Sequence, residues 1–146
     1  ASMTKLTGGC LCGAIRFEIT GEPMVISHCH CGTCRKATGA PFITWITLAP
    51  EGLRYIQGTP AIYRSSDTVR RTFCANCGTT LGYAADGYDD ELDISAAALD
   101  EPGQVVPDDH IWSDDMLPWF KFDDGLPRLP GSHWEHGYPD RTKAKE

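Results

Sequence analysis

Seven cysteines, gathered in three short clusters, constrain this 146-residue chain more than any other feature. The central cluster lies in the segment HCHCGTCRKATG, residues 28–39, and the other two lie on either side of it. The cysteines are Cys10 and Cys12, then Cys29, Cys31 and Cys34, and finally Cys74 and Cys77. An odd count, and pairs separated by one residue whose direct bridge would be strained, disfavour a disulfide framework. The pattern instead predicts metal ligation by thiolates.

The segment Cys74-Ala75-Asn76-Cys77-Gly78 has the spacing of a zinc knuckle. In a knuckle, a tight turn presents two sulfurs to one ion, and glycine relieves the backbone where it must curl. An iron–sulfur cluster is an alternative with weaker support from the spacing. Zinc is therefore the predicted metal.

Seven thiolate ligands divide naturally into four and three. If the chain is extended around Cys10 and Cys12, both side chains point to the same face and both sulfurs can reach one metal. With Cys74 and Cys77 they complete a closed four-thiolate site. Such a site is structural, and it would hold the N-terminal segment to a turn far along the chain.

The three central cysteines remain for a second zinc ion. Three protein ligands leave one position of a tetrahedral ion open, and an open position distinguishes catalytic from structural zinc. The alternative is a closed site completed by a histidine. His28 and His30 face away from the cysteines if residues 28–31 are extended, whereas a remote residue such as His110 could still complete the site.

A short helix is predicted over residues 34–38, with Thr33 as its N-cap and Gly39 at its end. Cys34 then lies in the first helical turn. The partial positive charge at the start of a helix favours a thiolate there.

Arg35 and Lys36 follow directly in the same helix. One interpretation is that these two cations offset thiolate charge and attract an anionic ligand. The other is that they form an ordinary solvated helix face.

The remaining sequence predicts one mainly β domain spanning residues 1–146. Strands are expected at 15–20, 42–47, 53–57, 61–65, 69–74, 79–84 and 92–96, separated by glycine and proline breaks. The 42–47 run is apolar on both faces, which predicts a buried central strand. The sheets are expected to be joined by tight turns, with helical turns kept short.

Residues 105–130 are rich in aromatics, acids and prolines and lack periodicity, so we expect an ordered coil that wraps the domain. Its aromatic side chains are either core contacts or, with His110 or Trp119, one wall of a pocket over the open zinc. The polar residues 132–146 are expected to form a flexible tail. Ala1 and Ser2 precede Met3, which reads as the initiator, so we interpret them as an added remnant.

The formal net charge of -7 and the scattered lysines and arginines exclude a basic face for nucleic acid. No apolar run has the length of a membrane span, and the N-terminus lacks a secretory signal pattern. We therefore expect a soluble, cytoplasmic protein with neither a nucleic-acid nor a membrane partner.

Four segments carry a resemblance to a known family. In chain order they are GGCLCGAIRFEI, HCHCGTCRKATGAPF, FCANCGTTL and HIWSDDMLPWFKFDDGLPRLP. In this order and at this spacing, from Gly8 to Pro130, the chain resembles the glutathione-dependent formaldehyde-activating enzyme family, which includes centromere protein V-like proteins. The resemblance implies the β-tent fold, an open stack of antiparallel sheets with zinc between its parts.

The resemblance also implies two zinc ions per chain. Structural zinc would be bound by Cys10, Cys12, Cys74 and Cys77, and catalytic zinc by Cys29, Cys31 and Cys34, which is the partition that ligand counting gives. The implied reaction condenses formaldehyde with the thiol of glutathione to S-(hydroxymethyl)glutathione, which is carbon–sulfur lyase chemistry in reverse. The cations proposed to meet the two carboxylates of glutathione, or else to be surface charges, are Arg35, Lys36, Arg70 and Arg71.

Two rival functions stay open at the level of sequence. One is action on a different small-thiol adduct, because a shared metal framework does not fix the substrate. The other is a non-catalytic module in which both zinc ions are structural and the surface binds a protein. Protein partners and the oligomeric state are not encoded in any pattern of this sequence.

Overall fold

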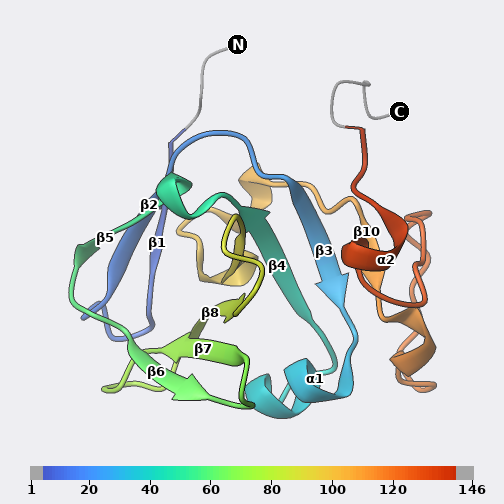
Figure 1. The fold of residues 1–146 in the computed structure, drawn as a ribbon, viewed down its shortest axis with the longest axis horizontal. Coiled ribbons are helices and arrows are strands. Elements are labelled where there is room, and N and C mark those ends of the chain that lie inside the picture. Colours follow the sequence, from blue (N-terminus) through green and yellow to red (C-terminus); the bar gives the residue numbers. More distant parts are fainter. Residues whose placement is uncertain (1–4, 141–146) are drawn as a thin grey trace.

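The computed structural model describes residues 5–140 and consists of two β-sheets with short helices at their edges (Figure 1). The smaller sheet has the strand order β1-β2-β5, and the larger has the order β10-β3-β4-β9-β8-β7-β6. The strands are β1 (Leu6–Gly9), β2 (Arg16–Ile19), β3 (Val25–Cys29), β4 (Ile43–Leu48), β5 (Leu53–Gln57), β6 (Ala61–Arg64), β7 (Val69–Phe73), β8 (Thr80–Ala85), β9 (Leu92–Ser95) and β10 (Asp109–Ile111). The mainly β prediction is confirmed.

The helical elements are all short. They are α1 (Gly32–Thr38), η1 (Pro50–Gly52), η2 (Ala96–Ala98), η3 (Pro102–Gln104), η4 (Ser113–Asp115) and α2 (His133–His136), where η marks a single 3₁₀ turn. Across residues 5–140, no helix has both the length and the apolar character required of a membrane span.

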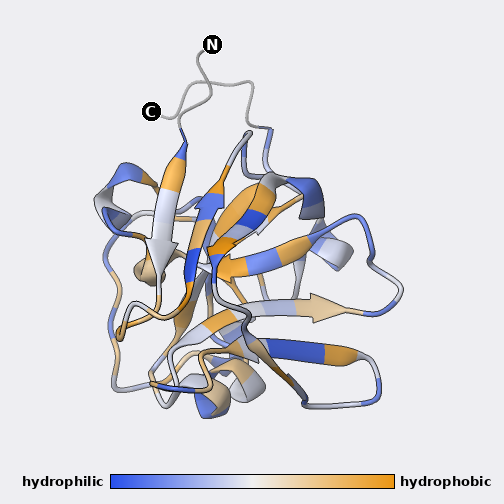
Figure 2. Cartoon of the chain, turned by 90° about the vertical axis from the view of Figure 1, so that its left-hand side faces the viewer, coloured by the Kyte–Doolittle hydropathy of each residue, from blue (hydrophilic) through white to orange (hydrophobic). Residues whose placement is uncertain are grey.

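The larger sheet is built around β4, which pairs with β3 on one side and β9 on the other. The apolar run predicted as a central strand is therefore an interior strand, between β3 and β9, with Ile46 fully buried. Ile46 lies opposite Ile94 of β9, so the two β-branched side chains pack on the same sheet face. Hydrophobic residues recur along the strands, as Figure 2 shows.

The smaller sheet packs its inner face on this core. Phe17 and Ile19 of β2 are buried, as the alternation in residues 15–20 predicts. Glu18 on the other face is also largely buried, because Lys5 and Arg54 both form ion pairs with its carboxylate. The core cluster contains side chains from both sheets, including Phe17 and Leu81.

The last third of the chain wraps the edge of the larger sheet, as expected for residues 105–130 (Figure 1). Its one strand, β10, pairs in parallel with β3, so the sheet is mixed. The prediction of a flexible tail from residue 132 is wrong for residues 132–140. These form α2 and the turn after it, and the buried His133 bonds to Ser27 and Asp109. Residues 141–146 and the predicted remnant Ala1 and Ser2 lie outside the described residues.

Candidate metal centres and active-site cavity

The four-cysteine cluster consists of Cys10, Cys12, Cys74 and Cys77, whose sulfurs all lie within 4.8 Å of one another. The Cys12 sulfur is 3.6 Å from that of Cys10 and 3.8 Å from that of Cys74. A Zn–S bond of about 2.3 Å in a tetrahedral site requires an S···S separation of about 3.8 Å. The donor set and its spacing therefore fit a closed zinc site.

The local backbone at the first pair differs from the extended segment that was expected. β1 ends at Gly9, and Cys10 begins a turn in which the Gly13 amide donates to the Cys10 carbonyl. Gly13 has a φ of 81°, which favours glycine. The turn, and not strand alternation, brings the Cys10 and Cys12 sulfurs together.

The second pair has the predicted knuckle geometry. The Cys77 amide donates to the Cys74 sulfur at 3.4 Å, and the Gly78 amide donates to the Cys74 carbonyl at 2.8 Å. Gly78 has a φ of 80°, so glycine does relieve the backbone where it curls. Because Cys10 follows β1 and Cys74 follows β7, the cluster joins the smaller sheet to the larger one.

The three-cysteine cluster consists of Cys29, Cys31 and Cys34, whose sulfurs also lie within 4.8 Å of one another. Cys29 is the last residue of β3, and Cys34 lies in the first turn of α1, as predicted. The helix starts earlier than expected, at Gly32, because Cys31 and not Thr33 is the N-cap: its sulfur accepts from the Cys34 amide at 3.3 Å. The helix ends at Gly39, as predicted, with a φ of 67°.

Among residues 5–140, no histidine, aspartate, glutamate or further cysteine joins the three-cysteine cluster. The histidines face the opposite side, as strand alternation predicts. His30 contacts His110 through Nε2 and Nδ1 at 2.8 Å, and His110 reaches Asp124 at 2.7 Å. His28 contacts the Thr44 hydroxyl. His110 is therefore engaged elsewhere and does not complete the site.

The three sulfurs lie close enough together that each affects the pKa of the others. Hydrogen bonds from the Cys29 and Cys34 thiols hold the pKa of Cys31 far below its usual range, and the same contact with Cys31 raises the pKa of Cys29. A divalent cation can replace the protons on three sulfurs this close together, because the thiolate is the form of cysteine that binds metal. The donor set therefore fits zinc with three sulfur ligands.

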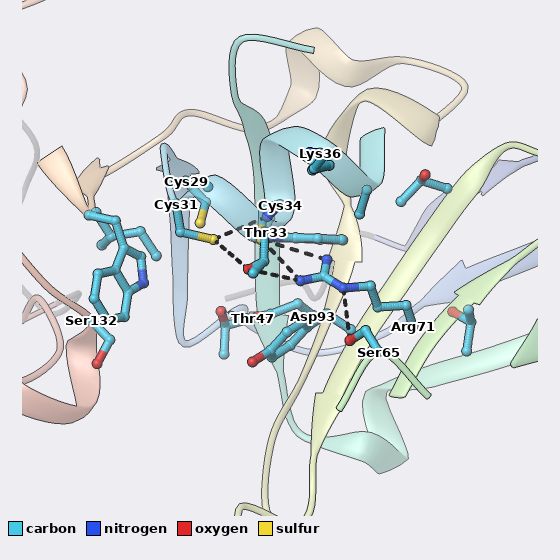
Figure 3. Close-up of a pocket in the computed structure, with 18 of the residues that line it drawn as sticks. Cys29, Cys31, Thr33, Cys34, Lys36, Thr47, Ser65, Arg71, Asp93 and Ser132 are labelled. Atoms are coloured by element: carbon cyan, nitrogen blue, oxygen red, sulfur yellow. Dashed lines mark hydrogen bonds between the residues drawn. The ribbon is translucent and has the colours of Figure 1, made fainter. Parts of the chain in front are cut away.

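Arg71 of β7 reaches across to this cluster (Figure 3). Its two terminal nitrogens each lie 3.7 Å from the Cys34 sulfur, and one also lies 3.4 Å from the Thr33 hydroxyl. Arg71 is buried, and Ser65 accepts from its Nε. A buried guanidinium beside the Cys34 sulfur provides a fixed positive charge there.

The other predicted cations divide by location. Lys36 lines the cavity described below, as Arg71 does. Arg35 donates instead to the backbone carbonyls of His30 and Asp115. Arg70 faces the opposite side of β7 from Arg71 and forms an ion pair with Asp86. Neither Arg35 nor Arg70 lines the cavity.

The three-cysteine cluster opens into a cavity of about 1180 Å³. Its walls include Trp45, Tyr83 and Asp93 of the larger sheet and Trp112 of the C-terminal coil. Desolvation among these packed side chains raises the pKa of Asp93 to about 7, against the opposing hydrogen bond from Thr47. A volume of this size accommodates a ligand as large as a tripeptide.

One of the two alternatives for residues 105–130 was an aromatic wall with His110 or Trp119, and the cavity does have a wall from this segment, but with different residues. Trp119 is 68% exposed and lies away from the cavity, and His110 is completely buried on the other side of β3. Ile111 and Trp112 form that wall instead. Trp112 adopts a left-handed backbone conformation, φ 54°, which no sequence pattern indicated.

Sequence reasoning missed two further parts of the cavity. Tyr83 and Asp93 were identified only as strand residues, although they lie directly opposite each other on β8 and β9. His133, Trp134 and Tyr138 line the cavity from the segment that was expected to be a flexible tail. The aromatic content of that segment was the only available signal.

Comparison with known proteins shows which family this chain resembles. Residues 5–115 match the family described as glutathione-dependent formaldehyde-activating enzyme. A Schizosaccharomyces pombe protein named as an uncharacterized lyase is 30% identical over 82% of this chain and 87% of its own length. A Halomonas elongata protein, named provisionally as a glutathione-dependent formaldehyde-activating enzyme, is 23% identical over 96% of this chain and 92% of its own.

Among solved structures, a Rhodobacter sphaeroides protein shares the fold, with a TM-score of 0.57 at 22% identity. That alignment covers 84% of this chain and 99% of the other. The family match spans both cysteine clusters and most of the cavity wall. The chain therefore belongs to the glutathione-dependent formaldehyde-activating enzyme family.

Proposed function

We propose that the protein is a zinc-dependent enzyme of the carbon–sulfur lyase type that condenses formaldehyde with a small thiol, glutathione first among them, to an S-hydroxymethyl adduct. The observation that carries the proposal is the three-cysteine cluster, which opens into a large cavity next to the buried guanidinium of Arg71. A closed structural site needs neither a cavity nor a neighbouring cation.

The three-cysteine cluster would hold the catalytic zinc, and the four-cysteine cluster a structural one. Zinc bound by three sulfurs supplies Lewis acidity for a thiolate or an aldehyde oxygen. Arg71 adds a fixed positive charge beside Cys34, which favours the anionic form of a thiol brought to the same place. Trp45 and Trp112 pack against the cluster and give it partly apolar surroundings.

The cavity is large enough for such a thiol, and its lining contains cations as well as the acids Glu91, Asp93 and Asp115. Glutathione carries two carboxylates, and Lys36 and Arg71 are cavity-lining cations. The names of the fission yeast and Halomonas relatives, a lyase and a formaldehyde-activating enzyme, agree with this assignment. Arg35 and Arg70 are not proposed to contact substrate, since both are bonded away from the cavity.

The test is an NMR exchange measurement on the zinc-loaded protein with formaldehyde and a panel of thiols: glutathione, cysteine, cysteamine and 2-mercaptoethanol. We expect adduct formation faster than the uncatalysed rate, with glutathione accelerated most. Cys29→Ser should abolish the acceleration without unfolding the chain. Absence of acceleration with every thiol would refute the proposed reaction, and a preference for another thiol would replace glutathione as the substrate.

A further inference from the structure

Four side chains form one row across the cavity face of the larger sheet. Arg71 of β7 lies opposite Tyr83 of β8, Tyr83 lies opposite Asp93 of β9, and Asp93 lies opposite Thr47 of β4. All four line the cavity. Because directly opposed residues point to the same sheet face, the row leads from the three-cysteine cluster into the body of the cavity.

Tyr83 is the member of this row that lies beside the cluster without being bonded to it. The Arg71 guanidinium lies 5.1 Å from the centre of the Tyr83 ring, while its nitrogens are 3.7 Å from the Cys34 sulfur. The ring also packs near Trp45, at 6.2 Å between centroids. Both contacts restrict the ring: Arg71 through a cation–π contact and Trp45 through packing.

The hydroxyl of Tyr83 has no hydrogen-bond partner among residues 5–140, although the side chain is half-buried and lines the cavity. The Tyr83 hydroxyl is not among the buried polar atoms that lack a partner, so it is open to the cavity, where it can bond to water or to a ligand. The neighbouring Thr47 and Asp93 are different, since they bond to each other. Tyr83 is thus held in place by its neighbours, and its O–H group is available as a donor to a ligand beside the three-cysteine cluster.

We infer that Tyr83 is a catalytic residue, whose hydroxyl donates a hydrogen bond to the oxygen that was the aldehyde oxygen of formaldehyde. The inference rests on the proposed function. In the forward step the substrate thiolate sulfur attacks the carbonyl carbon and forms the C–S bond. The C=O π pair moves to oxygen, and the developing alkoxide is stabilised by the Tyr83 O–H.

The proton balance closes without another reactant. The thiol gives one proton to solvent water when it becomes a thiolate, and the alkoxide takes one proton from solvent water to give the hydroxymethyl group, so thiol and formaldehyde combine with no net release. In the reverse direction the same hydrogen bond polarises the adduct oxygen as the C–S bond breaks. Tyr83 keeps its own proton throughout and acts on charge alone.

The first test is Tyr83→Phe, which removes the hydroxyl and keeps the ring between Arg71 and Trp45. We expect kcat to fall on the order of 100-fold, as for the loss of one oxyanion donor, with the KM for the thiol and the zinc content unchanged. Tyr88→Phe is the matched control: it also removes a phenol hydroxyl, from a ring that stacks on Trp134 and does not line the cavity. Unchanged kcat in Tyr83→Phe would overturn the inference.

The second test does not depend on turnover. Zinc-loaded wild type should bind S-(2-hydroxyethyl)glutathione more tightly than S-ethylglutathione in an NMR titration, and Tyr83→Phe should lose that preference. Suppose that wild type accelerates adduct formation with no thiol and yet shows this preference, which Tyr83→Phe then loses. That result would refute the proposed reaction but keep Tyr83 as a hydrogen-bond donor to the ligand oxygen. If wild type is active and Tyr83→Phe differs from it in neither test, the inference about Tyr83 is refuted and the proposed reaction stands.

Discussion

Both terminal nitrogens of Arg71 lie 3.7 Å from the sulfur of Cys34, a residue 37 positions earlier in the chain. Strand β7, which lies next to the edge strand β6 of the larger sheet, thus places a cation beside a cysteine of α1. The contact couples the geometry of the sheet to the electrostatics of the three-cysteine cluster.

Replacement of Arg71 should reduce activity. Arg71→Met removes a charge-assisted contact worth about 1.5–3 kcal/mol, so kcat/KM is expected to fall about 10- to 100-fold. Arg70→Met is the control, because Arg70 is adjacent in β7 but pairs with Asp86 outside the cavity. Equal losses in the steady-state rates of the two variants would contradict a role for Arg71 in catalysis.

The two cysteine clusters should separate in their effect on stability. Cys74→Ser opens the cluster that joins the two sheets and should lower the free energy of unfolding by several kcal/mol, because a structural zinc contributes folding energy directly. Cys29→Ser should abolish activity and remove one zinc while leaving most of the stability. Thermal unfolding and metal analysis of both variants check this; equal destabilisation would favour two structural sites.

Asp93 should make stability depend on pH. Burial raises its pKa from the ordinary 3.8 to about 7, so the folded state favours the neutral carboxyl. The stabilising effect of that preference is complete below about pH 4 and is lost as the pH rises through 7. Asp93→Asn keeps the side chain neutral, so the stability of this variant relative to wild type should increase from pH 4 to pH 8.

Urea unfolding of wild type and Asp93→Asn across that range measures the difference directly. The ionisable neighbours Glu91 and His133 are present in both proteins, so their titration cancels to first order. A stability difference that stays constant with pH would show that Asp93 titrates near its ordinary value.

His133 should hold the C-terminal wall in place. Although burial disfavours its charged form, hydrogen bonds to Asp109 and to the Gly137 carbonyl raise its pKa above the ordinary value. His133→Ala leaves the buried Asp109 without this partner and should cost about 3 kcal/mol of stability in urea unfolding. His136→Ala, an exposed position in the same helix, should change stability by less than about 0.5 kcal/mol.

The pH dependence of the His133 contribution provides a further check. A raised pKa means that the stabilisation is complete below about pH 6.5, the ordinary value for histidine, and declines at higher pH. The difference between wild type and His133→Ala should therefore narrow on going from pH 6 to pH 9. A difference that widens would contradict the ion pair with Asp109.

Local chemistry made the two cysteine clusters predictable. The knuckle at Cys74 is encoded within five residues, and the partition into four and three follows from counting. The interior position of β4 was also predictable, because residues buried on both faces must be apolar throughout. For Cys10 and Cys12 the grouping was correct although the expected extended backbone was not.

The cavity wall was not predictable, because it depends on pairings between distant segments. β10 has three residues and no periodicity, and it exists through its parallel pairing with β3. Whether Trp112 or Trp119 faces the cavity depends on the path of a coil that turns at a left-handed residue. The ordered conformation of residues 132–140 likewise depends on contacts of His133 with distant residues. One of them, Ser27, lies more than a hundred positions earlier in the chain.

The part of the cavity wall formed by α2 and the turn after it lies outside the region that matches the family. The region that matches the family, residues 5–115, contains every cysteine, whereas His133, Trp134 and Tyr138 on the cavity wall come after it. Exchange of a short C-terminal stretch would therefore change the cavity wall and leave every cysteine untouched. The lining of the cavity can thus diverge between relatives while both cysteine clusters stay fixed.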